Sequence, residues 1–122
     1  MTILVVEDET RIASFVRKGL KARGYEAETV ATGGAALARL AHGGVALMIL
    51  DLGLPDLDGI EVLQRVRRDG SPVPIIVLTA RNDAEDEIRE LNLPINGYIT
   101  KPFAFDHLAE CVRTGLANGH AA

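Results

Sequence analysis

The sequence lacks the features that mark exported or membrane-bound proteins. It has a single cysteine, Cys111, so no disulfide can form within the chain, and its neighbours predict an ordinary buried position on a helix. No apolar run approaches the roughly 18 residues that a membrane-spanning helix requires. The N-terminus, MTILVVEDE, is acidic where a signal peptide would be basic, which predicts no export. We therefore expect a soluble protein of the reducing cytoplasm.

An excess of basic residues is also missing. The chain has 13 lysines and arginines against 17 aspartates and glutamates, which gives a net charge of −4. This balance argues against a nucleic-acid-binding surface within the chain. Its 122 residues, 48% of them apolar, suit one domain with one core. Because we find no repeat, low-complexity tract or linker, we expect a single domain over residues 1–117 and a frayed tail over residues 118–122.

Apolar runs and helical patterns alternate along the chain. We expect strands at Ile3–Val6, Glu26–Ala31, Val45–Leu50, Pro74–Leu78 and Tyr98–Thr100. Between and after them, apolar residues at helical spacing and turn-forming glycines predict helices at Thr10–Arg23, Thr32–His42, Asp58–Arg68, Asp83–Leu91 and Ala104–Ala117. In the first helix the apolar positions are Ile12, Phe15, Val16 and Leu20, and in the third Ile60, Leu63 and Val66 are expected to face the core. Strands that are apolar throughout indicate a parallel sheet covered on both faces, so we predict a doubly wound α/β fold.

Polar side chains follow four of the predicted strands at the point where each strand ends. They are Glu7, Asp8 and Glu9 after the first strand, Asp51 after the third, Thr79 at the end of the fourth, and Lys101 after the fifth. Ligands of doubly wound sheets bind beyond the carboxyl ends of the strands. The topology therefore predicts that these side chains converge at one edge of the sheet.

The chemistry of this cluster indicates a cation and a phosphoryl group. Glu7, Asp8 and Asp51 would crowd several carboxylates together, and an oxygen-only set with room for water suits Mg²⁺. Lys101 adds a positive charge and Thr79 a hydroxyl donor, so the whole could receive a tetrahedral anion. Aspartate carboxylates also attack phosphorus, which would make Asp51 the site of an aspartyl phosphate.

The stretch after Asp51, LGLPDLDG, is expected to form a loop that completes the metal site. Gly53 and Pro55 would shape the loop so that a backbone carbonyl also reaches the metal, and the stretch Asp56–Asp58 is expected to cap the following helix. Taken alone, each candidate residue has an ordinary alternative role: Asp8 and Asp51 as caps or turn residues, Thr79 as a cap, Lys101 as a solvated lysine, and Glu9 as a solvated acid at a helix start. Only their joint placement favours a functional site.

Four segments, VVEDE, LDLGLPDLDG, VLTAR and YITKPF, resemble those of the receiver domain of bacterial two-component response regulators. The OmpR/PhoB-type subgroup is the most similar. The resemblance covers essentially the whole chain and implies a flavodoxin-like (CheY-like) sheet with strand order 2-1-3-4-5. It also implies a phosphorylation-controlled signalling switch, in which a sensor histidine kinase donates a phosphoryl group from its phosphohistidine to Asp51.

The resemblance assigns the metal site and the switch to particular residues. It implies that Asp8, Asp51 and the Gly53 carbonyl bind Mg²⁺, with Glu7 acting through water. Lys101 would contact the phosphoryl oxygens. Thr79 would reorient toward them, and Tyr98 would be the aromatic residue whose ring turns inward as Thr79 moves. The Lys101–Pro102 peptide bond is expected to be cis.

The expected output surface consists of the fourth helix, the fifth strand and the fifth helix, through which the subgroup forms a symmetric dimer. Residues 94–97 read Pro-Ile-Asn-Gly where the subgroup usually has Gly-Ala-Asp-Asp. Glu87 and His107 stand where the charges are usually reversed, so they could attract only when His107 is protonated. Arg113 remains, with no assigned partner. We therefore expect the dimer to be weakened or replaced, and any DNA contact to belong to a C-terminal effector domain outside this chain.

Three other functions remain to be weighed. A metal-dependent phosphotransferase or phosphatase acting on outside substrates would need a substrate domain or lid, and the chain offers neither. A flavin-binding carrier would need a phosphate loop rich in glycine and hydroxyl side chains after the first strand, where this chain has EDETRIAS. A degenerate receiver that is never phosphorylated would have lost part of the set Asp8, Asp51, Thr79 and Lys101, which is intact here.

Overall fold

Five parallel strands form one sheet in the order β2-β1-β3-β4-β5 in the computed structural model, which describes residues 1–119. The strands are β1 (Thr2–Val6), β2 (Ala27–Val30), β3 (Val45–Leu50), β4 (Ile75–Thr79) and β5 (Gly97–Thr100). Each neighbouring pair is parallel, so all the carboxyl ends lie at the same edge of the sheet. The predicted fold and strand order are therefore confirmed.

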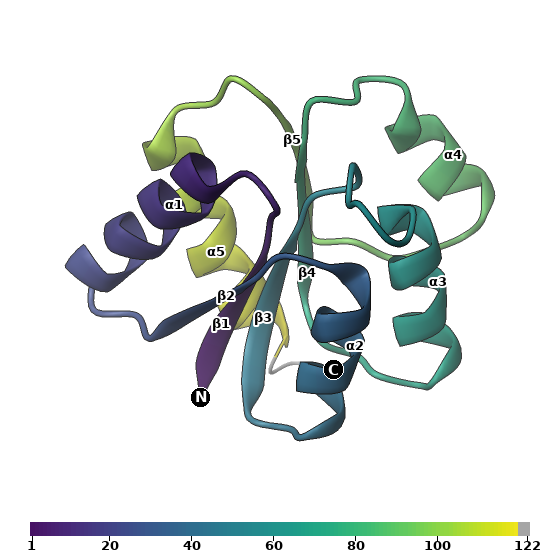
Figure 1. The fold of residues 1–122 in the computed structure, drawn as a ribbon, viewed down its shortest axis with the longest axis horizontal. Coiled ribbons are helices and arrows are strands. Elements are labelled where there is room, and N and C mark those ends of the chain that lie inside the picture. The colour runs from purple at the N-terminus through teal and green to yellow at the C-terminus, as the bar shows by residue number, and fades with distance from the viewer. Residues whose placement is uncertain (120–122) are drawn as a thin grey trace.

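Helices cover both faces of this sheet, as Figure 1 shows. They are α1 (Thr10–Ala22), α2 (Gly33–Ala41), α3 (Gly59–Arg68), α4 (Ala84–Glu90) and α5 (Phe105–Gly119). Helices α1 and α5 lie on one face, and α2, α3 and α4 lie on the other. Every predicted strand and helix is present, with ends that differ by a few residues. Helix α5 extends past Ala117 to Gly119, and the last part of the predicted tail, residues 120–122, lies outside the described residues.

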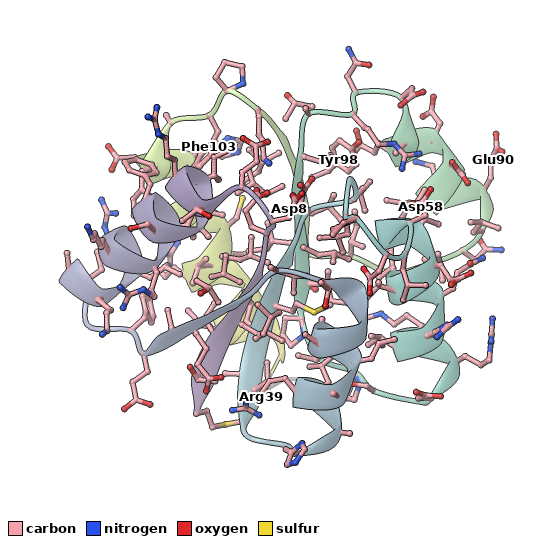
Figure 2. The ribbon with its side chains drawn as sticks, in the orientation of Figure 1. Asp8, Arg39, Asp58, Glu90, Tyr98 and Phe103 are labelled. Carbon is pink, nitrogen blue, oxygen red and sulfur yellow. The ribbon has the colours of Figure 1, made fainter. Side chains whose placement is uncertain are left out.

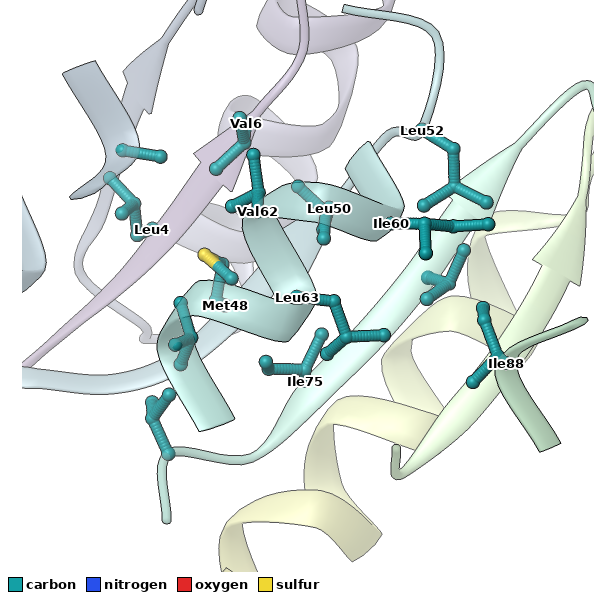
Figure 3. Close-up of a cluster of buried hydrophobic side chains, with 14 of the residues drawn as sticks. Leu4, Val6, Met48, Leu50, Leu52, Ile60, Val62, Leu63, Ile75 and Ile88 are labelled. Atoms are coloured by element: carbon teal, nitrogen blue, oxygen red, sulfur yellow. The ribbon is translucent and has the colours of Figure 1, made fainter. Parts of the chain in front are cut away.

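Side chains that alternate along the strands pack into two separate cores, one on each face of the sheet. Ile3 and Val5 of β1 pack under α1 and α5, whereas Leu4 and Val6 pack under α2 and α3. Figure 3 shows the second of these cores, in which Val62 of α3 lies beside the residues of β1 and β3. Because successive side chains of a strand point to opposite faces, a sheet covered on both faces buries all of them. This is why β1 is apolar after Thr2.

The ends of two helices follow the predicted local signals. Gly24 stops α1 with a φ of 90°, a conformation that costs glycine little. Thr32 caps α2 by accepting a hydrogen bond from the amide of Ala35 at 3.0 Å. One apolar residue of α1 stays outside the core: Phe15 is 54% exposed and packs edge-on against Phe103 and Phe105.

Two further observations bear on the earlier expectations. Cys111 is half-buried on α5, and burial raises the pKa of its thiol, in keeping with a structural position. None of the helices in the described residues is both long and apolar enough to cross a membrane.

Candidate functional site at the carboxyl edge of the sheet

The predicted acidic residues converge at the carboxyl edge of the sheet. Glu7 and Asp8 follow β1, and Asp51 follows β3, which is the neighbouring strand. One carboxylate oxygen from each of the three lies within 4.8 Å of the other two. Glu7 and Asp51 are buried, with 4% and 6% of their surface exposed, whereas Asp8, labelled in Figure 2, is exposed. The arrangement can hold a cation that reaches it from solvent.

Lys101 brings a positive charge into this acidic group. Its Nζ lies 2.5 Å from Oε1 of Glu7 and 3.4 Å from Oδ2 of Asp51. Burial alone would lower the pKa of Lys101, but the hydrogen bond to Glu7 and the charge of Asp51 outweigh burial and raise it. The lysine is therefore a fixed cation, held mainly by Glu7.

One ammonium does not balance the carboxylates. Burial raises the pKa of Glu7 to about 7, and repulsion by the charge of Asp51 adds to this effect. The hydrogen bonds that Lys101 and the amide of Glu9 donate to the Glu7 carboxylate lower the pKa and offset only part of the rise. The buried acidic group thus gains from a further positive charge. An oxygen-only donor set of this kind suits Mg²⁺ among the common metals.

Thr79 stands at the end of β4, between the strands that carry Asp51 and Lys101. It is buried, and its Oγ1 accepts a hydrogen bond from the amide of Arg81 at 3.3 Å. Its backbone carbonyl accepts one from the amide of Lys101 at 2.8 Å, which fixes the start of the segment after β5. The next peptide bond, Lys101–Pro102, is cis, in agreement with the expectation from the sequence. A hollow of about 400 Å³ opens beside Lys101 and Phe103.

The loop after Asp51 is folded tightly onto the site. The amide of Gly53 donates to Oδ1 of Asp51 at 3.3 Å, and Gly53 also pairs with Asp58 in an isolated antiparallel bridge. Asp58 caps α3 as predicted, accepting from the amide of Ile60 at 2.9 Å. Within the predicted capping stretch Asp56–Asp58, only Asp58 caps α3, because the carboxylate of Asp56 accepts from the amides at the start of α2.

Arg81 is the residue that the sequence reasoning missed. Its guanidinium lies 3.1 Å from the carboxylate of Asp58 and 3.8 Å from that of Glu87 on α4. Its carbonyl accepts a hydrogen bond from the hydroxyl of Tyr98, the predicted switch aromatic. One residue thus connects the loop after Thr79 with α3, α4 and β5. The only signal in the sequence was a basic side chain two positions after Thr79. Basic side chains are common on protein surfaces, so this signal did not single out Arg81.

The expected output surface carries charges that are engaged within the chain. Glu87 faces Arg81, and Arg113 pairs with Glu110 one turn earlier on α5. The carbonyl of Pro94 accepts hydrogen bonds from Arg67 of α3 at 2.9 and 3.1 Å. The segment that differs from the subgroup is therefore fastened to α3, and Arg113 has a partner that the sequence did not identify.

Comparisons with known proteins agree with the site. Residues 3–113 match the response regulator receiver domain family. The chain is 40% identical to the uncharacterized transcriptional regulatory protein YkoG of Bacillus subtilis over 114 residues, covering 93% of this chain and 50% of that protein. It is 39% identical to the transcriptional regulatory protein KdpE of Mycobacterium tuberculosis, covering 98% and 53%. The chain thus spans about half the length of these curated relatives.

Solved structures show the same fold with similar sequences. A CheY-like receiver domain protein from Methanospirillum hungatei is 30% identical with a TM-score of 0.90, covering 98% of this chain and 96% of that one. The response regulator TrrA from Thermotoga maritima, solved in complex with Mg²⁺-BeF, is 34% identical with a TM-score of 0.85, covering 94% and 99%. These matches do not favour an enzyme acting on outside substrates. The chain belongs to the response regulator receiver domain family, and a phosphorylation-controlled switch fits its site.

Proposed function

We propose that Asp51 accepts a phosphoryl group from the phosphohistidine of a sensor histidine kinase, in a reaction that depends on Mg²⁺. The observation that carries this proposal is the position of Asp51. It is 94% buried within a group of three carboxylates, and its Oδ2 lies 3.4 Å from Nζ of Lys101. In the transfer, a carboxylate oxygen of Asp51 bonds to phosphorus while the P–N bond of the phosphohistidine breaks, and the electron pair returns to the imidazole nitrogen.

The acidic group supplies the ligands for the cation. Asp8 and Asp51 are proposed as direct ligands together with the backbone carbonyl of Gly53. Glu7 acts through water, since one of its oxygens is already occupied by Lys101. A bound Mg²⁺ would neutralise charge on the phosphoryl oxygens as they approach Asp51. Glu7 also keeps Lys101 in place beside Asp51.

Lys101 and Thr79 act on the phosphoryl oxygens. Lys101 offers a fixed positive charge, and the hydroxyl of Thr79 can donate once it turns from Arg81 toward Asp51. The same groups are proposed to support the later loss of phosphate to water. The domain thus catalyses its own phosphorylation and dephosphorylation and has no outside substrate.

Phosphorylation adds up to two negative charges at Asp51, and these favour one arrangement of the surrounding loops. Movement of Thr79 would break the hydrogen bond from the amide of Arg81, and Arg81 is also bound to Tyr98 and near Glu87. The change would therefore reach the surface formed by α4, β5 and α5. We propose this surface as the output of the switch.

The rest of the protein is proposed by analogy with its relatives. The two curated relatives, YkoG and KdpE, are about twice as long as this chain and are called transcriptional regulatory proteins. We propose that residues 1–117 form the N-terminal regulatory domain of such a regulator, with DNA contacted through a C-terminal effector domain. A homodimer through α4, β5 and α5 would be weakened or altered, because Glu87 and Arg113 already have partners within the chain. Sedimentation of the phosphorylated domain tests this, and a tight dimer would contradict it.

The phosphorylation itself is tested by intact mass. The domain is incubated with a small phosphodonor and Mg²⁺, with excess chelator, or with neither. The wild type should gain one phosphoryl mass only with free Mg²⁺, and Asp51→Asn should gain none. A gain of equal size in Asp51→Asn would refute the assignment of the acceptor.

A further inference from the structure

The carboxylate of Asp56 joins the loop after Asp51 to a different helix. Its Oδ1 accepts a hydrogen bond from the amide of Gly33 at 2.8 Å, and its Oδ2 accepts one from the amide of Gly34 at 2.9 Å. Both amides belong to the first turn of α2, where amide groups lack partners within the helix. The amide of Leu57 adds a third hydrogen bond at 2.9 Å. The two carboxylate oxygens thus hold the loop to α2.

Two adjacent glycines make this approach possible. A Cβ on Gly34 would lie 3.3 Å from Oδ2 of Asp56. A Cβ on Gly33 would lie 2.8 Å from Cγ2 of Val62 and 3.1 Å from Cβ of Leu57. Side chains at these positions would crowd the loop and α3. The Gly33–Gly34 pair is therefore shaped for the close packing of residues 52–58 against α2.

The same loop contains the backbone group proposed for the cation. At its ends, Gly53 pairs with Asp58, and the amide of Gly59 donates to the carbonyl of Leu52 at 2.9 Å. Asp56 lies between these attachments and is exposed, so it contributes no core packing to the site. Its hydrogen bonds to α2 hold the middle of the loop from outside.

We propose that Asp56 is a positioning residue for the cation site. By holding residues 52–58 against the start of α2, it keeps the carbonyl of Gly53 in place relative to the carboxylate of Asp51, and so strengthens the binding of Mg²⁺. This inference rests on the proposed function, in which that carbonyl is a ligand. Groups that orient metal ligands typically change metal affinity about 10- to 100-fold when removed.

Thr32 provides a matched control. It caps the same end of α2 by accepting a hydrogen bond from the amide of Ala35. Within the described residues, the side chain of Thr32 forms no hydrogen bond with residues 52–58. Thr32→Ala and Asp56→Ala each remove a cap of α2, whereas only Asp56→Ala also frees the loop. Mg²⁺ affinity is measured by calorimetric titration of chelator-treated protein in about 0.15 M salt, which screens exposed charges beyond roughly 8 Å. Circular dichroism and thermal unfolding monitor the fold of each variant.

The inference predicts a loss of Mg²⁺ affinity of about 10-fold in Asp56→Ala and less than about twofold in Thr32→Ala. Asp56→Asn, which keeps one acceptor oxygen, should lie between the wild type and Asp56→Ala, and it replaces Asp56→Ala in the comparison if the latter does not fold. Equal losses in the Thr32 and Asp56 variants, or wild-type affinity in both Asp56 variants, would overturn the inference while leaving the proposed function intact. A wild type that binds no Mg²⁺ would instead overturn the proposed cation site itself.

Discussion

Lys101 lies closer to Glu7 than to Asp51, with its Nζ 2.5 Å from the first carboxylate and 3.4 Å from the second. Glu7 thus holds Lys101 beside Asp51, the proposed acceptor. Its segment is further held by the hydrogen bond from its amide to the carbonyl of Thr79. A phosphoryl group on Asp51 would compete with Glu7 for the ammonium of Lys101. Because Lys101 follows β5 and is hydrogen-bonded to the end of β4, the charge at Asp51 is linked to the positions of both strands.

Removing this ammonium should destabilise the domain most when no metal is present. Lys101→Met keeps the apolar stem but leaves Glu7 and Asp51 buried with no cation. We expect the free energy of unfolding in chelator to fall by roughly 2–3 kcal/mol, because breaking a buried ion pair leaves an uncompensated charge. Mg²⁺ should recover part of this loss. Urea unfolding with and without Mg²⁺ measures both effects, and an unchanged unfolding free energy in chelator would contradict them.

Gly53 in the loop and Gly59 at the start of α3 should respond differently to the same substitution. A Cβ on Gly59 would lie 2.4 Å from Cα of Leu52 and 2.8 Å from the carbonyl oxygen of Asp51, so Gly59→Ala must displace backbone next to the acceptor. A Cβ on Gly53 would meet nothing within 4 Å. Neither glycine has a positive φ, so the contrast reflects space alone.

We expect Gly59→Ala to cost about 1–3 kcal/mol of stability and to slow phosphorylation, and Gly53→Ala to change stability by less than about 0.5 kcal/mol. Thermal unfolding and the rate of mass gain with a phosphodonor measure the two variants. Equal stability of Gly53→Ala and Gly59→Ala would show that the loop is not packed as described.

Arg81 should hold α4 in its present position. This helix has two buried residues, Ala84 and Ile88, and the side chain of Asp83 forms no cap at its start. The ion pairs of Arg81 with Asp58 and Glu87 are partly exposed, so Arg81→Gln should loosen α4 by about 0.5 kcal/mol, roughly a twofold faster amide exchange. Exchange in α2 is the internal control.

A second variant separates the role of Arg81 from a general loss of surface charge. Arg89 pairs with Asp86 on the exposed side of α4 and contacts neither α3 nor β5 through any hydrogen bond or ion pair in the described residues. Arg89→Gln should therefore leave the exchange of α4 closer to that of the wild type. If both variants exchange equally fast, Arg81 has no special part in holding the helix.

The attachment of Asp56 should be visible in the pH dependence of stability. The amides of Gly34 and Gly33 lower the pKa of Asp56 from its ordinary value of 3.8. A carboxyl group whose pKa is lower in the folded state stabilises the fold above its unfolded pKa, and this contribution is lost as the pH falls through the folded pKa. The difference in unfolding temperature between wild type and Asp56→Ala should therefore be constant near neutral pH and shrink below about pH 3.8. A difference that persists at lower pH would show that the charge of Asp56 is not involved.

The strand ends and the residues that follow them could be predicted from the sequence, because the physics there is local. Apolar runs such as Val45–Leu50 end abruptly at Asp51, and parallel topology then brings all such ends to one edge. The predicted meeting of Glu7, Asp8, Asp51 and Lys101 needed no knowledge of side-chain packing. Helical periodicity is also a local signal, and it correctly predicted that Ile60, Leu63 and Val66 face the core.

Contacts between distant segments could not be predicted in this way. An aspartate just before a helix usually caps that helix, and Asp58 does so. Asp56 instead reaches the unpaired amides at the start of α2, 23 residues earlier in the chain, where two glycines leave room for the close approach. Arg81 likewise pairs with Asp58, 23 residues away, and Phe15 finds aromatic partners on another segment and stays partly exposed. Such partners depend on how loops cross the sheet edge, which local patterns do not encode.

The central claim is that Asp51 carries the phosphoryl group, and chemical mapping tests it most directly. Wild-type domain treated with a phosphodonor and Mg²⁺ is reduced with borohydride, which converts an acyl phosphate to the alcohol, and the peptides are then sequenced by mass spectrometry. We predict homoserine at position 51 in the sample with Mg²⁺ and none in the sample with chelator. Homoserine at Asp8 or Asp56 in place of Asp51, or equal labelling in chelator, would contradict the account.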